Sequence, residues 1–457
     1  DVGHGAQAGD FVTYSGAVSL GGNITASILN SEFEITTYIS TSQYTITASV
    51  AANASDSGNG GAAVVGAYQI TTGSDIYTQN VGWGAGGWSG VTTGYTSTGW
   101  GAAAPAGLGI GVQLRLWSDS NYGEDLVLNP RGGAMYYWAN AASPNTFNRG
   151  QLLGPSATVT TKAGAISIDA YCPSVANIVM VSDASRFVIA FGCNDAVAGS
   201  SVQNPMFVAW SDQENIAVWY PSATNQAGSY QLSHGSQIIT AIQTRQEILV
   251  LTDAAIYSMQ YLGPPYVWGF QLMGDNISIA GPNAIATANN VTYWMGTDKF
   301  YMYSGRVETL PCSLRQYVYD DINLTQSYQF FASTNEGYSE IWFFYCSANS
   351  TTVDRYVIFN HLERTWYYGT LARTYWLDSP LRSVPMSAGY SGQLIYQETG
   401  TDDGTTNPPT AITAYVQSSD FDIGDGHNFG LVTRIIPDVT FDGSRINNPS
   451  EIGRAHV

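Results

Sequence analysis

Residues 236–274 read SQIITAIQ (236–243), EILVLTD (247–253), AIYSMQYLG (255–263) and YVWGFQLMG (266–274), four short apolar segments in close succession. Each segment has the length and the apolar, β-branched and aromatic content of a β-strand. Because the segments are apolar on both faces, they are expected to be covered on both sides. The stretch therefore predicts a four-stranded sheet that lies between neighbouring sheets.

The same pattern of short apolar segments recurs before and after this stretch. Clusters of three or four short strands begin near residues 108, 177, 283 and 326, and two further strands from residue 382 start a sixth cluster. The strands expected in the second cluster are NIVMVSD (177–183), RFVIAFG (186–192), MFVAWSD (206–212) and NIAVWYP (215–221). Those expected in the fourth are NAIATA (283–288), VTYWMGTD (291–298), KFYMYSG (299–305) and RVETL (306–310). A repeat of ~40–50 residues with four strands per unit is typical of β-propeller blades. We therefore expect an all-β fold, with a propeller of about six blades over residues 107–400. A pair of β-sandwiches is the alternative fold.

The composition also favours β-structure. The chain has 457 residues, of which 11% are charged and 13% aromatic, and its only lysines are Lys162 and Lys299. Charged residues usually make up ~25% of a globular protein. This chain therefore has too few of the charged residues that normally cover the exposed faces of helices. The formal net charge is −19. No Lys/Arg cluster suits phosphate binding, so we do not expect a protein that grips nucleic acid.

The chain divides into five segments that differ in composition and in the pattern of apolar residues. Residues 1–75 show period-2 alternation broken by Gly and Asn, which indicates a small β-module of three or four strands. Residues 76–106 are rich in Gly and carry Trp83, Trp88 and Trp100, which indicates an ordered connector rather than a phosphate-binding loop. The propeller (107–400) and two long strands of an incomplete C-terminal extension (401–450) follow. The fifth segment is 451–457.

The two ends suggest a fragment from environmental sequencing. The chain begins at Asp1 rather than Met, and it ends in EIGRAHV, residues 451–457. A back-translation of IGRAHV matches a common sequencing adapter. We therefore expect residues 451–457 to be a sequencing scar and leave them out of the fold prediction.

One short helix is expected within PCSLRQYVYDDIN. Ser313 could cap its first turn, and four apolar side chains fall on one face of it, namely Leu314, Tyr317, Val318 and Ile322.

The search for chemistry in the sequence finds no catalytic motif. There is no GxSxG, HExxH or P-loop, and no pair among the five histidines, His4, His234, His361, His427 and His456, is close in sequence. The spacing of the four cysteines, Cys172, Cys193, Cys312 and Cys346, fits no zinc pattern and predicts ordinary buried thiols. No apolar run reaches the ~18 residues of a membrane span. We therefore expect no enzyme, no cofactor, no metal and no membrane partner.

Carboxylates and aromatic runs leave weaker alternatives. Adjacent pairs occur at Glu124–Asp125, Asp320–Asp321 and Asp402–Asp403, but neighbours on a strand point to opposite faces and cannot flank one glycosidic bond. Three carboxylates at Asp420–Asp425 could hold Ca²⁺, although a solvated hairpin turn is the simpler interpretation. The runs Tyr136–Trp138, Trp342–Tyr345 and Trp366–Tyr368 could stack on sugars or fill the space between blades.

Six stretches, taken together and in order, resemble tail proteins of podovirus-type bacteriophages, namely the hub or nozzle subunit. They are RLWSDSNYGEDLVLNPRGGAMYYW (115–138), FVAWSDQENIAVW (207–219), AGSYQLSHGSQI (227–238), EILVLTDAAIYSMQYLGPP (247–265), VTYWMGTDKFYMYSGRVETLPC (291–312) and DRYVIFNHLERTWYYGTLAR (354–373).

The first residues carry a second resemblance. HGAQAGDFVTYSGA (4–17), LNSEFEITTYIS (29–40) and QYTITA (43–48) are similar to a small β-module often inserted in phage tail proteins, which resembles the first catalytic-cysteine half-domain of ubiquitin-activating enzymes. The stretch contains no Cys, so ubiquitin chemistry is not implied.

The resemblance to tail hubs implies a non-enzymatic virion protein made in the bacterial host cytoplasm. It implies a ring of copies that contacts the tail adaptor or portal complex and the tail fibres, around a conduit through which viral DNA passes without specific binding. An acidic wall would let DNA slide past. The alternative function is a carbohydrate-active or carbohydrate-binding propeller, which convergent carboxylates and exposed aromatics in a central pocket would favour.

Overall fold

The structure is a computed structural model, and part of the chain is described in it. The described residues are 10–57, 59–69, 116–140, 150–183, 185–379, 381–390 and 392–400, the strands β5 (Val91–Thr92) and β6 (Tyr95–Thr96), and single residues near the two ends. Residue contacts divide the chain into two units, 1–399 and 400–457. Nearly all of the expected connector, C-terminal extension and terminal scar lies outside the described residues. The expected domain boundaries stay predictions.

The first residues form a small four-stranded antiparallel sheet with the strand order β3-β2-β1-β4. Its strands are β1 (Phe11–Ser15), β2 (Glu32–Ser40), β3 (Gln43–Ile46) and β4 (Val65–Gln69), and a one-turn helix, α1 (Ala26–Leu29), precedes β2. Val12, Phe33 and Ile35 are buried on one face of the sheet. The alternation of buried and exposed residues along β2 is what the period-2 pattern of the sequence predicts.

Six antiparallel sheets follow one another from residue 117 to residue 396. The first sheet consists of β7 (Trp117–Tyr122), β8 (Asp125–Pro130), β9 (Met135–Trp138) and β10 (Gln151–Leu153). The second consists of β13 (Ile178–Val181), β14 (Val188–Phe191), β15 (Phe207–Trp210) and β16 (Gly228–Gln231). The third consists of β17 (Ile238–Gln243), β18 (Ile248–Thr252), β19 (Ala255–Gly263) and β20 (Val267–Asp275).

The fourth sheet consists of β21 (Ile285–Ala288), β22 (Val291–Met295), β23 (Phe300–Tyr303) and β24 (Val307–Leu310). The fifth consists of β25 (Phe331–Asn335), β26 (Glu340–Tyr345), β27 (Arg355–Asn360) and β28 (Thr365–Thr370). The sixth consists of β29 (Tyr375–Leu377), β30 (Met386–Ala388) and β31 (Leu394–Tyr396). Shorter elements between strands are the hairpin β11 (Thr158–Thr161) and β12 (Gly164–Ser167), the helix α2 (Arg315–Asp321), and the 3₁₀ turns η1 (Leu324–Gln329) and η2 (Glu336–Tyr338).

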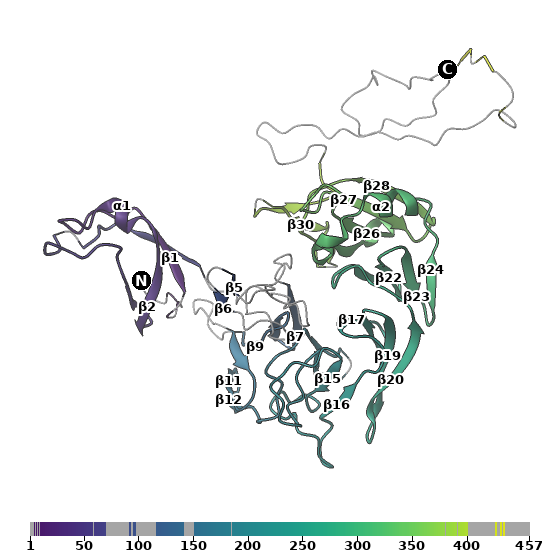
Figure 1. Cartoon of the computed structure of the whole chain (residues 1–457), viewed down its shortest axis with the longest axis horizontal. Helices are drawn as coiled ribbons and strands as arrows, with labels where there is room; N and C mark the ends of the chain where they lie inside the picture. Colours follow the sequence, from purple (N-terminus) through teal and green to yellow (C-terminus); the bar gives the residue numbers. More distant parts are fainter. Residues whose placement is uncertain are drawn as a thin grey trace. The chain divides into compact units, whose positions relative to one another are not determined.

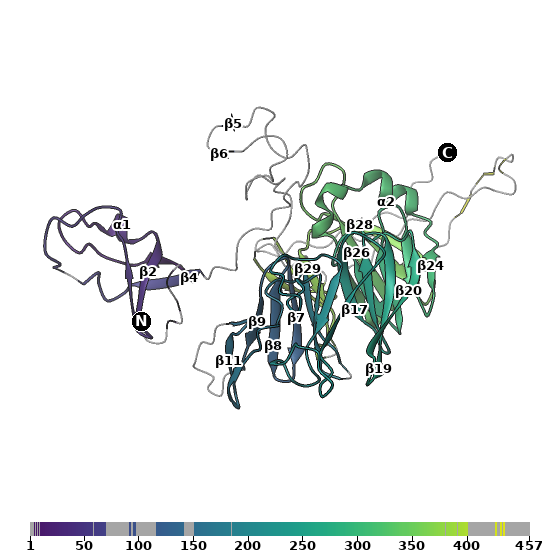
Figure 2. The same ribbon diagram turned by 60° about the horizontal axis from the view of Figure 1, so that its bottom comes forward.

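The sheets are the blades of a β-propeller, as the sequence predicted (Figures 1 and 2). Within each sheet the strands are hydrogen-bonded in chain order, so the first strand lies at one edge. First strands of successive sheets meet, because β13 lies against β7, β21 against β25 and β25 against β29. Residues of β7, β13, β17 and β29 line one common cavity. The first strands are therefore the innermost strands, around a shared axis.

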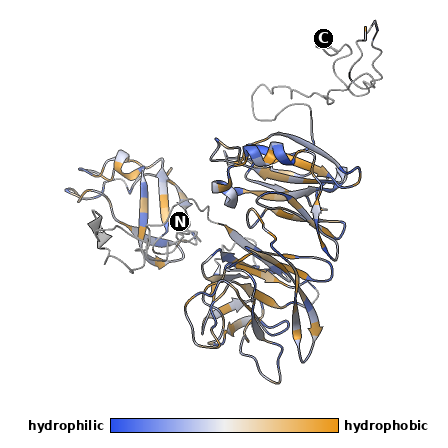
Figure 3. Cartoon of the chain, turned by 45° about the vertical axis from the view of Figure 1, so that its right-hand side comes forward, coloured by the Kyte–Doolittle hydropathy of each residue, from blue (hydrophilic) through white to orange (hydrophobic). Residues whose placement is uncertain are grey.

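The blades are held together by apolar contacts between their faces. In β26 five consecutive residues, Ile341 to Tyr345, are buried, because neighbouring sheets cover both faces. Figure 3 shows that the strands of the propeller carry long hydrophobic stretches. Trp294 and Phe300 of the fourth sheet and Phe343 of the fifth belong to one buried cluster. Burying a side chain of this size stabilises the fold by about 1.5–3 kcal/mol.

One expected strand of the second sheet is wrong. Residues 215–221 (NIAVWYP) form turns instead of a strand. The fourth strand of this sheet is β16, which lies further along the chain and begins at Gly228. Ile216 and Trp219 are nevertheless buried, so the apolar run marks a buried loop. The Asp169 carboxylate makes this possible, because its Oδ2 accepts hydrogen bonds from the backbone N–H of Trp219 (2.6 Å) and of Tyr220 (3.0 Å). A side chain thus replaces the strand partner that the loop lacks.

The helix within PCSLRQYVYDDIN is confirmed as α2, and Val318 is buried as expected. The proposed cap is wrong. The residue before the helix is Leu314, and no side chain caps the first turn. Of the other residues expected on the apolar face, Leu314 and Ile322 lie against the core, but Tyr317 is 39% exposed.

Candidate functional site

The axial cavity is the first candidate site. It has a volume of about 360 Å³ and is lined by residues from strands of four sheets and from connections between strands, among them Asp119, Arg131, Asp183, Gln243 and Tyr375. Each of these side chains comes from a different segment of the propeller. The cavity therefore exists because the blades meet around one axis.

Arg131 is the most deeply buried charged residue of this cavity, with 7% of its surface exposed. It lies in the turn after β8, which Gly132 makes possible by adopting a positive φ of 72°. Its Nη2 donates to the backbone carbonyl of Ile238 in the third sheet (3.3 Å). The Tyr328 hydroxyl, in η1 before the fifth sheet, interacts with the guanidinium and favours its charged form. One side chain thus links three parts of the ring.

Burial lowers the pKa of Arg131, and the Tyr328 hydroxyl partly opposes this effect. An arginine nevertheless stays protonated in proteins, so the axis carries a fixed positive charge. Asp119 and Asp183 line the same cavity and supply negative charge. Within the described part of the chain, the buried Oε1 of Gln243 has no hydrogen-bond partner, although its Nε2 donates to Thr244 O (2.7 Å). The cavity is suited to a few waters or a small polar solute.

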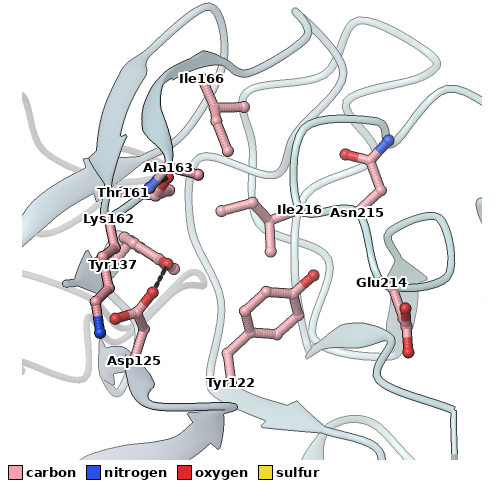
Figure 4. A pocket seen from close by; sticks show the side chains of 10 residues that line it. All are labelled: Tyr122, Asp125, Tyr137, Thr161, Lys162, Ala163, Ile166, Glu214, Asn215 and Ile216. Carbon is pink, nitrogen blue, oxygen red and sulfur yellow. Dashed lines mark hydrogen bonds between the residues drawn. The ribbon is translucent and has the colours of Figure 1, made fainter. Parts of the chain in front are cut away.

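A second cavity of about 260 Å³ opens beside the first and second sheets (Figure 4). Its lining includes Tyr122 of β7, Asp125 of β8, Tyr137 of β9, Lys162 of the β11–β12 turn and Glu214. In Figure 4 the Tyr137 hydroxyl points at the Asp125 carboxylate, to which it donates a hydrogen bond. Asp125 Oδ1 also accepts from the backbone N–H of Asn140 (2.8 Å). The carboxylate is therefore held by structural partners.

The titration of the tyrosines in this cavity follows from their surroundings. Burial raises the pKa of Tyr122 to about 12, with a further contribution from Glu214 that Arg186 partly offsets. Burial and then the hydrogen bond to Asp125 raise the pKa of Tyr137 even further. Both hydroxyls stay neutral near pH 7 and can serve as hydrogen-bond donors, but neither is poised as a general base.

We expect stability to fall at alkaline pH because of such tyrosines. Their folded pKa values lie above the ordinary value of about 10, so stability is complete below pH ~10 and is lost as pH rises from there towards 12. Denaturant unfolding at several pH values, together with tyrosinate absorbance, measures this loss. The variant Tyr122→Phe should show a shallower decline. Titration of every tyrosine near pH 10 in the native chain would contradict the prediction.

The histidines and cysteines are not brought together into a site. His234 is exposed, His361 lies against the Tyr293 ring (centroids 6.4 Å apart), and His427 and His456 lie outside the described residues. All four cysteines are free thiols, three of them buried and Cys312 partly buried. Burial raises the pKa of Cys312 and of Cys346 to about 12, which makes both poor nucleophiles. The prediction of buried free thiols is confirmed for Cys172, Cys193 and Cys346, whereas Cys312 is only partly buried.

The carboxylate pairs of the sequence have separate partners in the structure. Glu124 forms an exposed ion pair with Lys162 (3.0 Å), whereas Asp125 binds Tyr137. Asp321 lies at the end of α2, where its Oδ2 is 3.6 Å from Arg355 Nε. Asp402–Asp403 and the candidate Ca²⁺ turn at Asp420–Asp425 lie outside the described residues. Among the residues that are described, no group of three or more His, Cys, Asp or Glu could hold a metal ion.

The aromatic runs are mainly packing residues. Trp342, Phe343, Phe344 and Tyr345 are buried, and Tyr137 of the first run is 2% exposed. Trp366 lies against the same core, but Tyr367 and Tyr368 are exposed on the outer strand β28. Sequence reasoning missed Arg131, Tyr122 and Glu214 of the two cavities, because no local motif marks them. Within the described segments, no helix has the length and apolar character to cross a membrane.

Comparisons with known proteins show no family for this chain. No family model and no curated protein matches it. Among solved structures, Hsv2 of Kluyvelomyces marxianus is 9% identical, with a TM-score of 0.33, over 66% of this chain and 78% of that one. The dihydro-heme d1 dehydrogenase NirN is 10% identical, with a TM-score of 0.35, over 62% of this chain and 53% of that one. Similarity at this level assigns no function. The class, an all-β propeller protein, follows from the sheets themselves.

Proposed function

We propose that the chain is a non-enzymatic structural protein of a short-tailed bacteriophage virion, a tail hub or nozzle subunit that forms part of the DNA ejection conduit. The observation that carries the proposal is the ordered set of tail-protein-like stretches along the propeller. Residues 115–138 span β7 to β9, residues 247–265 span β18 and β19, and residues 291–312 span β22 to β24. The resemblance thus follows the blades of one continuous scaffold.

Rigid joints between blades support this role, because a tail part must hold its shape under internal pressure. Side chains of β7 bond the backbone of β13: the N–H groups of Val179 and Val181 donate to Ser118 Oγ (2.9 Å) and Ser120 Oγ (3.0 Å). Between the third and fourth sheets, the Tyr303 hydroxyl donates to Glu247 Oε1 (2.7 Å). These bonds resist sliding of one blade past the next.

The axis of a single propeller is not the conduit in this proposal. Arg131 crosses the axial region, and the cavity there measures about 360 Å³, which suits a small solute rather than a DNA duplex. The conduit therefore lies between copies of the chain, arranged in a ring. The adaptor or portal complex and the tail fibres are its other proposed partners.

The hairpin of β19 and β20 offers a surface for contact between copies. Each strand has nine residues, whereas the other propeller strands have three to six. Residues 254–274 contain no Lys, Arg, Asp or Glu, and Leu262 and Tyr266 are 59% and 78% exposed. Two copies with a net charge of −19 repel each other. Contact through an uncharged apolar surface keeps this electrostatic repulsion lowest and buries apolar area.

Mass spectrometry of virus-sized particles, purified from the source sample on a density gradient, tests the proposal. Trypsin should release YVIFNHLER (Tyr356–Arg364) and TWYYGTLAR (Thr365–Arg373). We expect both peptides to peak in the same fractions as capsid peptides. Their restriction to the soluble or cellular fraction would overturn the virion assignment, and glycan-cleavage assays would then test the carbohydrate-active alternative.

A further inference from the structure

The small N-terminal sheet carries a groove that the proposed function does not use. The groove has a volume of about 730 Å³ and is lined by Tyr14, Gln43, Tyr44, Val65 and Tyr68, among others. We call it the tyrosine groove. It lies within the size range of small-ligand sites in proteins.

The groove forms where the two edges of the sheet approach each other. β3 and β4 are the outermost strands in the order β3-β2-β1-β4. The hydroxyl of Tyr44 on β3 nevertheless lies 3.0 Å from that of Tyr68 on β4, and 2.7 Å from that of Tyr14 on β1. The sheet is therefore strongly curled, and a chain of three tyrosine hydroxyls crosses the gap between its edges.

The rings of Tyr44 and Tyr68 are held in place by contacts with His4. The His4 ring contacts the rings of Tyr44 (centroids 4.9 Å apart) and Tyr68 (6.1 Å). His4 Nε2 is in turn hydrogen-bonded to the carbonyl of Ser40 (3.0 Å). Tyr14, Tyr44 and Tyr68 also lie against the buried core of the sheet. A ligand would thus meet a floor whose rings are already ordered, which reduces the entropy lost on binding.

The chemistry of this floor suits a hydroxyl-bearing ligand. A tyrosine hydroxyl donates one hydrogen bond and accepts two, so the Tyr14 and Tyr44 hydroxyls have more capacity than the bonds of Tyr44 to Tyr14 and to Tyr68 use. The hydroxyls lie next to aromatic rings and to the exposed apolar side chains of Ile39 (55%) and Val65 (61%). Alternating polar hydroxyls and apolar C–H faces are what a sugar ring presents.

Charge narrows the choice of ligand. Residues 1–69 contain five acidic residues and no Lys or Arg, and the lining of the groove is uncharged. Phosphate, sulfate and carboxylate groups would find no cation there and would be repelled. An extended peptide is also disfavoured, because the bond between Tyr44 and Tyr68 bridges the gap into which an added strand would have to fit.

We propose that the tyrosine groove binds a neutral saccharide. The Tyr14 and Tyr44 hydroxyls bond its hydroxyl groups, and the tyrosine rings and the apolar rim cover its C–H face. The inference concerns the N-terminal sheet alone and is independent of the proposed role in the virion.

Binding of the full chain to an array of neutral oligosaccharides, followed by calorimetry with the best binder, tests the inference. Tyr14→Phe and Tyr44→Phe, which keep the rings, should each weaken binding about tenfold through the loss of a hydroxyl partner. Tyr38→Phe is the matched control, because Tyr38 is an exposed tyrosine of β2 that does not line the groove, and it should leave the affinity unchanged.

A second measurement needs no variant. Hydroxyl-radical footprinting of the unmodified chain should show that the bound oligosaccharide protects Tyr44 and Tyr68 but not Tyr38. The proposal is overturned by an array without any neutral binder, by protection elsewhere in the chain, or by selective binding of an uncharged peptide probe instead.

Discussion

Replacing Arg131 by methionine should lower the free energy of unfolding by about 2–4 kcal/mol. Arg131 is 7% exposed and donates to the Ile238 carbonyl across the axis of the propeller. The Tyr328 hydroxyl also interacts with the guanidinium. Methionine keeps the apolar stem of the side chain but removes the charged donors, so the Ile238 carbonyl loses its hydrogen-bond donor and the Tyr328 hydroxyl loses its charged neighbour.

Denaturant unfolding of the wild type and the Arg131→Met variant measures this loss. Arg245→Met is the matched control, because Arg245 is exposed, and its change should stay below about 0.5 kcal/mol. A double-mutant cycle with Tyr328→Phe should give a coupling energy above about 0.5 kcal/mol. Equal stabilities for the Arg131 and Arg245 variants would show that the axial bonds contribute nothing.

Replacing Trp376 by alanine should cost about 3–5 kcal/mol, the largest effect that we expect. Trp376 lies in β29 and is 1% exposed. Its ring stacks on Trp342 of the fifth sheet, with centroids 4.7 Å apart, and its Nε1 donates to the Thr334 carbonyl (3.1 Å). Ser333 Oγ donates to the carbonyl of Trp376 (3.0 Å). These contacts attach the last, three-stranded sheet to its neighbour.

Loss of Trp376 should therefore release the last sheet before the rest of the propeller unfolds. Limited proteolysis with mass spectrometry should find new cleavage between residues 375 and 400 in Trp376→Ala. Tyr396→Ala, in the same sheet but 59% exposed, is the control and should be cleaved like the wild type. A Trp376→Ala chain with wild-type stability and cleavage would refute the role assigned to this side chain.

The fold was predictable where burial leaves a mark on the local sequence. All four strands of the third sheet and all four of the fourth were expected from their apolar runs, because strands covered on both faces are apolar throughout. The pattern failed at NIAVWYP, which is equally apolar but is held as a loop by Asp169. It also missed β29, whose three residues are too few to show a period.

The candidate sites were not predictable, because they depend on contacts between distant residues. Arg131 and Ile238 are 107 positions apart, and no local spacing connects them. Tyr44 and Tyr68 looked like ordinary members of alternating strands, and it is the curl of the sheet that joins their hydroxyls. Sequence periodicity reports which face of a strand is buried, but it does not report how far a sheet bends.

The order of strands within the sheets has a consequence for how the chain acquires its structure. Each blade uses consecutive segments, so almost all strand pairing is local and can form as soon as one blade has left the ribosome. Formation of the axial cavity is different, because Tyr375 of the last sheet must come to the cavity that Trp117 and Ser118 of the first sheet line. Synthesis therefore sets the order of events: blades form one by one, and the cavity receives its residues from the last sheet only after that sheet has been made.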